Sequence, residues 1–365
     1  MARYTATDPD TGLSIRKALY GRTEQEARAK LIGALKAKQD GTLVVGRGRQ
    51  PTLAEYARRW IASSQRRIRP RTLHRYEELL KAHLLPRLGK VQLVRLEPRH
   101  LNAVMVAMHE QGLSPRTVNY ARQTLRALLN EAMREGLVGR NVAQLVRPLP
   151  NQDHRVAVLT PEQISILLKA AERDRDGPLW IVAIATGARQ SELFGLRWGE
   201  VDLAARRLSI VRTLQFQDGV GWLVQPCKTE RSRRWVPLPE IAVEALHRQR
   251  QLQAMERLES GPRWSEELGD LVFRAPGGAP EKSTTVTQRF QRRLEKLGLP
   301  RVGFHSLRHS AASTLAAAGV PLRSVSELLG HSQLATTSDL YVHIFEQAHR
   351  EVAIAMDRAL QRGRH

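Results

Sequence analysis

Six residues in the second half of this 365-residue sequence have side chains that suit chemistry at a phosphodiester. Arginines can stabilise phosphate charge, lysine and histidine can transfer protons, and a tyrosine hydroxyl is a latent nucleophile. Such a cationic set favours a phosphodiester, because its negative charge increases in the transition state. No Walker loop, catalytic carboxylate pair or Gly-x-Ser-x-Gly elbow competes with this interpretation. The six residues are Arg189, Lys228, His305, Arg308, His331 and Tyr341.

Each of these residues has a more ordinary interpretation when it is taken singly. An arginine three residues before a glutamate, as in Arg189 and Glu192, is typical of a surface ion pair. Lys228 and His331 can be solvated loop residues, and Tyr341 beside an apolar stripe can belong to a core. Their occurrence together in one segment favours the chemical interpretation.

The residues around these side chains indicate how they are positioned. Gly187 is expected to end one helix and Arg189 to begin the next, where backbone N–H groups also favour an anion. Glu192, one turn further on, can brace the neighbouring side chains. Lys228 is expected at a turn between two strands, and His331 just after a glycine that stops a helix.

A histidine pair gives one alternative, a metal site. His305, Arg308 and His309 are expected on one face of a helix, and histidines four residues apart have zinc-ligand spacing. A zinc protease helix would carry a glutamate after the first histidine, but here that residue is Ser306. Arg308 in the same cluster would repel a dication. We therefore expect neither a metal nor a cofactor.

Two linker-like stretches predict a multidomain chain. Glycine and proline concentrate around residues 46–51 and 147–153 and discourage regular structure there. We expect domains over residues 1–46, 51–148 and 156–365. The first has the pattern of a β-hairpin followed by a helix, and the second that of an all-helical bundle. The third is expected to be mainly helical (α+β), with a small antiparallel sheet.

Local signals predict the individual elements. The expected strands are Ala2–Thr7, Ser14–Tyr20, Arg207–Leu214, Gly221–Pro226 and Arg233–Leu238. Capping boxes and first-turn prolines mark several helix starts. The expected helices cover Glu24–Lys38, residues 53–63, Leu73–Leu85, residues 98–111, residues 115–135, a helix opening at Pro161, Pro178–Thr186, Gln190–Arg197, and most of the sequence from Pro239 onward.

The charge of the chain favours a polyanionic partner, and nucleic acid first of all. The sequence has 58 lysines and arginines against 36 aspartates and glutamates, which gives a net charge of +22. Residues 51–155 carry 19 basic and 8 acidic residues, half of that excess. Its arginines are expected to contact DNA phosphates without reading sequence, in particular Arg66, Arg67, Arg69, Arg71, Arg116, Arg122 and Arg126.

The cysteine content and the hydropathy pattern predict a compartment. Cys227 is the single cysteine, which excludes an intrachain disulfide framework and fits a reducing interior. The sequence has no run of 18 apolar residues and no secretory h-region. We expect a cytoplasmic, nucleoid-associated protein that does not contact membranes.

The order and spacing of the motifs resemble the signature of tyrosine recombinases, specifically phage-type integrases. The catalytic resemblance covers about residues 157–345, and residues 51–148 resemble the family's core-site-binding domain. Residues 1–45 resemble, more weakly, the arm-site-binding domain of integrases. The matching motifs are Thr-Gly-x-Arg-x-x-Glu-Leu at 186–193, His-x-Leu-Arg-His at 305–309, Leu-Leu-Gly-His-Ser at 328–332 and Tyr341-Val342-His343.

The resemblance implies a role for each matched residue. Tyr341 would attack phosphorus, which leaves a 3′-phosphotyrosine and a free 5′-hydroxyl. Arg189 and Arg308 would clamp the non-bridging oxygens, and Lys228 would protonate the departing 5′-oxygen. His305 would help to take the tyrosine proton. His331 would hydrogen-bond the phosphate. Glu192 and His309 would support the site.

The resemblance also implies partners and leaves alternatives. It implies double-stranded attachment sites, a homotetramer on DNA, and for some members an excisionase and a host DNA-bending protein. A recombinase that resolves chromosome or plasmid dimers is one alternative, although such enzymes usually lack a module like residues 1–45. A DNA-binding regulator with a silent catalytic domain would have lost a catalytic position. A metal-dependent nuclease would be inhibited by a chelator.

The C-terminal segment predicts a contact between protomers. Residues of about 345–360 have a helical pattern with an apolar stripe at four-residue spacing. We expect this helix to dock on a neighbouring protomer, and packing on its own domain is the alternative. The stripe consists of Ala348, Val352, Met356 and Leu360.

Overall fold

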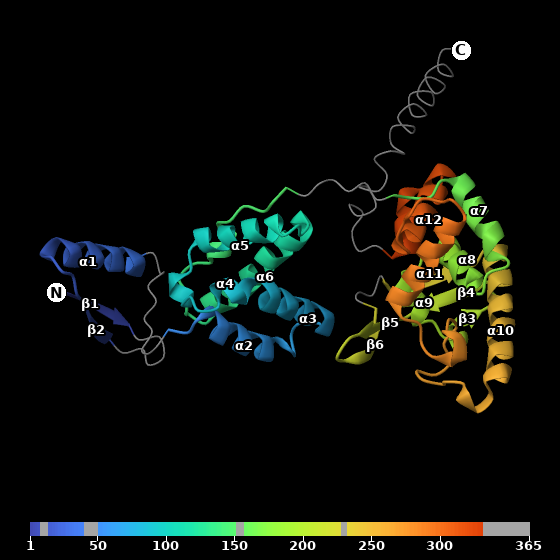
Figure 1. Ribbon diagram of the computed structural model, residues 1–365, viewed down its shortest axis with the longest axis horizontal. Coiled ribbons are helices and arrows are strands. Elements are labelled where there is room, and N and C mark those ends of the chain that lie inside the picture. Colours follow the sequence, from blue (N-terminus) through green and yellow to red (C-terminus); the bar gives the residue numbers. More distant parts are fainter. Residues whose placement is uncertain (8–13, 40–49, 151–156, 228–231, 331–365) are drawn as a thin grey trace, which may run out of the picture. The chain divides into compact units, whose positions relative to one another are not determined.

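The computed structural model describes the chain except for residues 8–13, 40–49, 151–156, 228–231 and 331–365 (Figure 1). The chain forms two compact units, residues 1–154 and residues 155–365. Within the described residues, no helix is both long enough and apolar enough to cross a membrane.

The N-terminal module is a two-stranded antiparallel ribbon with one helix. Strand β1 (Ala2–Thr7) pairs with β2 (Ser14–Leu19), and α1 (Glu24–Gln39) contacts both strands. Thr23 accepts a hydrogen bond from the Glu26 N–H at 3.2 Å, as the capping box predicts. The Glu26 carboxylate, however, accepts from the backbone N–H of Arg22 instead of Thr23. These elements match the expected strands and helix to within one residue at each end.

A helical bundle follows, and capping residues mark the starts of two of its helices. Thr52 and Glu55 form a complete capping box, and the Ser114 hydroxyl accepts a hydrogen bond from the N–H of Thr117. The core contains Trp60, which stacks on Tyr76 with 5.6 Å between ring centroids. The main helices are α2 (Leu53–Ser64), α3 (Pro70–Leu79), α4 (Leu85–Leu88), α5 (Pro98–Glu110) and α6 (Pro115–Arg134).

The expected helix Leu73–Leu85 is wrong in its bounds and its geometry. The helix starts three residues earlier, at Pro70, because proline is favoured in a first turn. It then passes through a π-helical segment, Leu80–Leu84, before α4. Pro86 lies in the next turn and has no N–H to donate. A π-helical turn absorbs this interruption without ending the helix.

The C-terminal unit is mainly helical, with two small antiparallel sheets. One sheet has the order β3 (Val201–Asp202), β4 (Arg207–Ile210), β7 (Arg234–Pro237), and the other pairs β5 (Arg212–Gln217) with β6 (Gly221–Pro226). The helices are α7 (Pro161–Ala171), α8 (Gly177–Thr186), α9 (Gln190–Phe194), α10 (Glu240–Ser260), α11 (Ser283–Lys296), α12 (His305–Ala317) and α13 (Leu322–Leu329). The multidomain, mostly helical class is thus confirmed, with a second small sheet added.

Helix α8 forms the centre of this unit. It is apolar on every side, so it is stable only when other elements surround it. Helices α7, α10 and α12 contact it, and Figure 1 shows it enclosed by these elements. Trp180 on α8 packs against Phe290 and Phe304, with ring centroids 5.0 and 5.8 Å away. This packing fixes the starts of α9 and α12, which carry candidate catalytic residues.

Two expected elements of this unit are wrong. The strand Arg207–Leu214 is two strands, because β4 pairs with β7 whereas β5 pairs with β6, and the chain changes partner at Val211. The helix Gln190–Arg197 ends at Phe194. Gly195 then packs so closely on β5 that a Cβ would lie 3.2 Å from its backbone.

The sequence from Pro239 onward is less helical than expected. Residues 261–282 contain only short 3₁₀ turns between α10 and α11. Glycines with positive φ interrupt the helical pattern here, since other residues rarely adopt that conformation. They are Gly261, Gly269, Gly277 and Gly278.

Candidate active site

The first part of the site is a buried carboxylate at the start of α9. Gly187 ends α8 in the left-handed conformation, with φ of 59°, and Arg189 is the N-cap of α9. The Glu192 carboxylate accepts hydrogen bonds from the Arg189 backbone N–H at 2.9 Å and from its Nη1 at 2.7 Å. The Glu192 side chain is 2% exposed and that of Arg189 is 35% exposed. Arg189 thus reaches the surface while its partner does not.

Arg308 is fixed between two helix ends. Its Nη1 donates to the carbonyl of Gly187 at 2.7 Å, and its Nη2 donates to the carbonyl of Leu329 at 2.6 Å. Burial, together with the charge of Arg189, lowers the pKa of Arg308 to about 9. The guanidinium therefore stays charged at neutral pH, and its position depends on backbone atoms.

Two histidines lie one turn apart at the start of α12. The rings of His305 and His309 meet edge to face, with centroids 4.7 Å apart. Desolvation and the charge of Arg308 lower the pKa of His305 below its usual value. Burial and the neighbouring His305 lower the pKa of His309 to about 4. Both rings are therefore neutral at pH 7 and can accept a proton.

Arginines from three elements converge on the carboxyl end of α13. Arg234 Nε donates to the Leu328 carbonyl at 2.6 Å, and Arg308 donates to the next carbonyl along the chain. Arg189 Nη2 makes a longer contact of 3.5 Å with the carbonyl of Gly330. The carbonyl end of a helix is the negative end of its dipole, which suits cations. These contacts fix the carboxyl end of α13.

Sequence reasoning missed Arg234. This side chain on β7 is 7% exposed, and its Nη2 donates to Glu192 Oε2 at 3.1 Å. The strand that carries Arg234 was predicted from the sequence. Side chains alternate between the two faces of a strand, so residues two apart, such as Arg234 and Val236, lie on the same face. Because Val236 on that face is fully buried, Arg234 also had to point inward. A buried arginine of this kind requires a carboxylate partner.

The structure brings together four of the predicted site residues and adds Arg234. Arg189 and Arg308 contact the end of α13, Glu192 pairs with Arg189, and His305 lies one turn before Arg308 on α12. His309 packs behind His305. Lys228, His331 and Tyr341 lie outside the described residues, and so does the C-terminal helix expected over residues 345–360.

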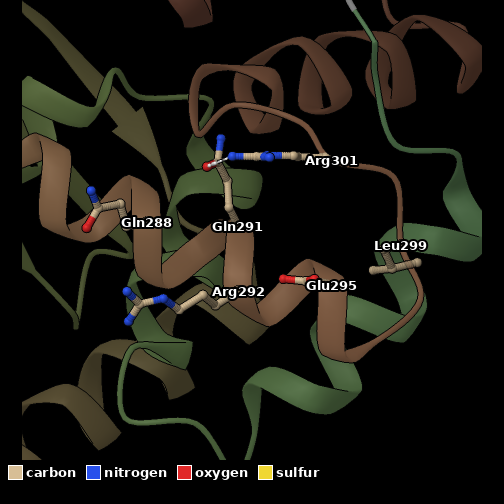
Figure 2. Close-up of a pocket in the computed structure, with 6 residues that line it drawn as sticks. All are labelled: Gln288, Gln291, Arg292, Glu295, Leu299 and Arg301. Atoms are coloured by element: carbon tan, nitrogen blue, oxygen red, sulfur yellow. Dashed lines mark hydrogen bonds between the residues drawn. The ribbon is translucent and has the colours of Figure 1, made fainter.

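A separate pocket lies on α11 and the turn that follows it. Figure 2 shows Arg301 directed at Gln291, to whose Oε1 it donates a hydrogen bond at 3.2 Å. Of the predicted catalytic residues that the structure describes, none contributes to its lining. The lining residues are Gln288, Gln291, Arg292, Glu295, Leu299 and Arg301.

Six of the seven arginines predicted to contact DNA are exposed on the helical bundle. Around the end of α2 and the start of α3 lie Arg66, Arg67, Arg69 and Arg71, and on α6 lie Arg116 and Arg126. Arg67 also pairs with Glu131 at 2.9 Å.

The seventh arginine of that set, Arg122, is buried and not exposed as the prediction requires. The side chain is buried, and its Nη1 donates to the carbonyls of Ala143 and Val146 at 3.1 and 3.0 Å. It faces inward because it occupies the same side of α6 as Val118 and Leu125, which are fully buried. Arg122 therefore stabilises the turn after α6 and does not reach a phosphate.

Comparison with known proteins identifies the family. The description "phage integrase family" matches residues 157–348, which is more than half of the chain, and "phage integrase, N-terminal SAM-like domain" matches residues 52–105. An integrase of Streptomyces ambofaciens is 31% identical over 373 residues, covering 98% of this chain and 92% of that protein. The chain belongs to the phage integrase family.

Further comparisons agree with this integrase assignment. A XerC-like tyrosine recombinase of Caldanaerobacter subterraneus is 28% identical over 359 residues, covering 92% of this chain and 90% of that protein. The Tn1549 transposon integrase in complex with circular intermediate DNA has the same fold, with a TM-score of 0.72 at 22% identity, over 84% of this chain and 99% of that one. The chain is thus a site-specific recombinase, an enzyme that cuts and rejoins DNA.

Arg122 and Arg126 provide a first test, because they lie one turn apart on α6 and differ in burial. Arg122→Met removes the donor to two carbonyls and is expected to lower the free energy of unfolding by about 1–3 kcal/mol. Arg126→Met, at an exposed position, is expected to change it by less than about 0.5 kcal/mol. Urea denaturation measures both. Equal effects of the two substitutions would contradict a structural role for Arg122.

Proposed function

We propose that this recombinase cleaves DNA through Tyr341. Its hydroxyl attacks the scissile phosphorus, a 3′-phosphotyrosine forms, and the 5′-oxygen leaves as a hydroxyl. The observation that supports this best is the convergence of Arg189 and Arg308 on the end of α13, with His305 one turn before Arg308 on α12. Helix α13 ends twelve residues before Tyr341 in sequence. A bound phosphate there would meet two cations and a neutral base.

The two arginines are proposed to clamp the non-bridging oxygens. Each terminal nitrogen of a guanidinium carries two hydrogens. In Arg308, one hydrogen of each terminal nitrogen is directed at a backbone carbonyl, and a second one is left for phosphate. Arg189 is partly exposed and presents its charge from the other side. A preorganised pair of this kind stabilises the charge that develops in the transition state.

Proton transfers are proposed for two further residues, and a hydrogen bond to the phosphate for a third. An ordinary tyrosine has a pKa of about 10, so Tyr341 needs a base and a cationic environment. His305 is neutral at pH 7 because desolvation and Arg308 lower its pKa, so it can take the tyrosine proton. Lys228 is proposed to protonate the departing 5′-oxygen, and His331 to hydrogen-bond the phosphate. Neither lies within the described residues.

We further propose that the reaction needs neither metal nor ATP. Arginines supply the charge stabilisation that metal ions give in other phosphoryl-transfer sites. The phosphotyrosine bond conserves the energy of the broken phosphodiester, so rejoining can follow by attack of a 5′-hydroxyl.

The proposed partners are double-stranded attachment sites, on which four protomers assemble, as the family resemblance implies. The net charge of +22 supports a DNA partner. The exposed arginines of α2, α3 and α6 are proposed to contact phosphates. Residues 1–46 are proposed as a separate domain that binds arm sites. The protein is also proposed to be located at the nucleoid and to act with an excisionase and a host DNA-bending protein.

The proposed biological role is integration and excision of a mobile element. The Streptomyces ambofaciens integrase supports this role, because its similarity extends over 98% of the chain and thus includes most of the N-terminal module. Resolution of chromosome or plasmid dimers is the second candidate, and the similarity to a XerC-like recombinase favours it.

Adduct formation tests the nucleophile. We expect nicked suicide DNA from the chain's own attachment site to give an SDS-resistant protein–DNA adduct in the presence of EDTA. Tyr341→Phe is expected to abolish it, whereas Tyr20→Phe, an exposed tyrosine outside the catalytic region, is expected to leave it intact. The readout is the shifted band on a denaturing gel.

Each other outcome has a distinct meaning. An adduct that survives Tyr341→Phe would show that the nucleophile is another residue. A requirement for divalent metal would favour a nuclease. Binding of the site without any adduct would favour a regulator whose catalytic domain is silent.

The pH dependence of cleavage tests His305 as the base. The base form is the neutral ring, and the pKa of His305 lies below its usual value of 6.5. The single-turnover rate is therefore expected to be level near pH 7 and to fall about tenfold per pH unit once the pH drops below that pKa. His305→Gln is expected to lower the rate by about 10²-fold or more and to remove this acid limb.

The matched control for this experiment is His247→Gln, an exposed histidine on α10. It is expected to leave both the rate and the acid limb unchanged. An acid limb that persists in His305→Gln would assign the titration to a different group.

A further inference from the structure

We propose that Arg234 is a positioning residue for the reaction, because it neutralises Glu192 and so leaves the charge of Arg189 available to the scissile phosphate. The inference rests on the proposed function, in which Arg189 clamps that phosphate. It gives a role to a side chain on β7 that lies outside the family motifs identified in the sequence.

The geometry is one carboxylate held between two guanidinium groups. Arg189 Nη1 lies 2.7 Å from Glu192 Oε1, and Arg234 Nη2 lies 3.1 Å from Oε2. A longer contact of 3.5 Å joins Arg234 Nη1 to Oε1. The three groups together carry one net positive charge. One of the two arginines must therefore retain a charge that the carboxylate does not compensate.

Burial decides which arginine keeps that charge for a ligand. The Arg234 side chain is 7% exposed and is surrounded by Glu192 and the carbonyls of Ser232 and Leu328. The Arg189 side chain is 35% exposed. Within the part of the chain that the structure describes, Arg234 makes four hydrogen bonds to these partners, whereas Arg308, which is also buried, makes two and keeps a hydrogen on each terminal nitrogen for phosphate. A phosphate therefore meets Arg189 and Arg308 and not Arg234. Arg234 therefore serves as the internal counter-ion of Glu192.

The same guanidinium also connects two backbone segments. Its Nε donates to the carbonyl of Leu328 at 2.6 Å while its terminal nitrogens contact Glu192. Arg234 thus sets the distance between the start of α9 and the end of α13. A lysine has a single ammonium group and cannot reproduce this planar bridge.

Loss of Arg234 is expected to weaken catalysis through Arg189. In Arg234→Gln, Glu192 retains Arg189 as its counter-ion, so the attraction of Arg189 for phosphate decreases. We expect adduct formation in single turnover to slow roughly tenfold to a hundredfold. The Kd for uncleaved attachment-site DNA is expected to increase only by the share that the scissile phosphate contributes, because the other phosphate contacts of the duplex are retained.

A second substitution distinguishes this role from simple stabilisation of the fold. Arg234→Gln combined with Glu192→Gln removes the uncompensated carboxylate and is expected to recover most of the lost rate. Arg175→Gln, which breaks a partly buried ion pair with Glu256 elsewhere in the unit, is the matched control. It is expected to lower Tm while leaving the rate of the folded protein unchanged. If Arg234→Gln behaves like this control, with no recovery in the double variant, the proposal is wrong.

A binding measurement tests the proposal without cleavage. We would compare the Kd for an attachment-site duplex with that for the same duplex carrying a neutral methylphosphonate at the scissile position. The wild type is expected to prefer the charged phosphate, Arg234→Gln to lose much of that preference, and the double variant to regain it.

The two measurements separate failure of the inference from failure of the proposed function. A wild type that forms the Tyr341 adduct, with an Arg234→Gln variant that keeps rate and preference, overturns only the role of Arg234. A wild type without adduct, whose preference still depends on Arg234, overturns the proposed cleavage and supports only the electrostatic effect of Arg234 on phosphate binding. A wild type with neither adduct nor preference overturns both.

Discussion

The buried carboxylate of Glu192 is the interaction on which the rest of the site depends. Burial alone would raise the pKa of Glu192, but Arg234 and then Arg189 outweigh it and keep the group ionised. A buried charge is tolerated only when it is paired and hydrogen-bonded. Removal of either arginine leaves the carboxylate partly unpaired, a change that is usually strongly destabilising. The Glu192 carboxylate therefore fixes the positions of α9 and β7 relative to each other and, through Arg234, that of the end of α13.

The ends of helices supply most of the remaining precision. Arg308 is held by the carbonyl of Gly187 after α8 and by that of Leu329 at the end of α13. Gly187 and Gly330 both have left-handed conformations, which leave these terminal carbonyls pointing outward from the helices. Backbone carbonyls do not change rotamer, so the guanidinium groups are oriented by the fold itself. This explains why a glycine lies two residues before Arg189 and another directly before His331 in sequence.

Structural features that depend on neighbouring residues could be predicted from the sequence. Features that depend on residues distant in the chain could not. Caps such as Thr52 with Glu55 act over three positions, so helix starts could be predicted well. Arg189, His305 and Arg308 were found because motifs carry them. Arg122 was misplaced because its carbonyl partners lie 21 and 24 residues away, and Arg234 was missed because Glu192 is 42 residues away. The change of strand partner at Val211 likewise depends on a pairing that no local pattern contains.

The electrostatics of the site explain why it suits an anion. Burial and the nearby Arg189 lower the pKa of Arg308, so its charged form is at a disadvantage in the unliganded protein. A phosphate between the two arginines would offset the repulsion between their charges. Desolvation, and after it the charges of the same arginines, lower the pKa of His305 below its usual value. These charges would also favour the ionised form of an approaching tyrosine hydroxyl. One cluster of charges thus serves substrate binding, base and nucleophile together.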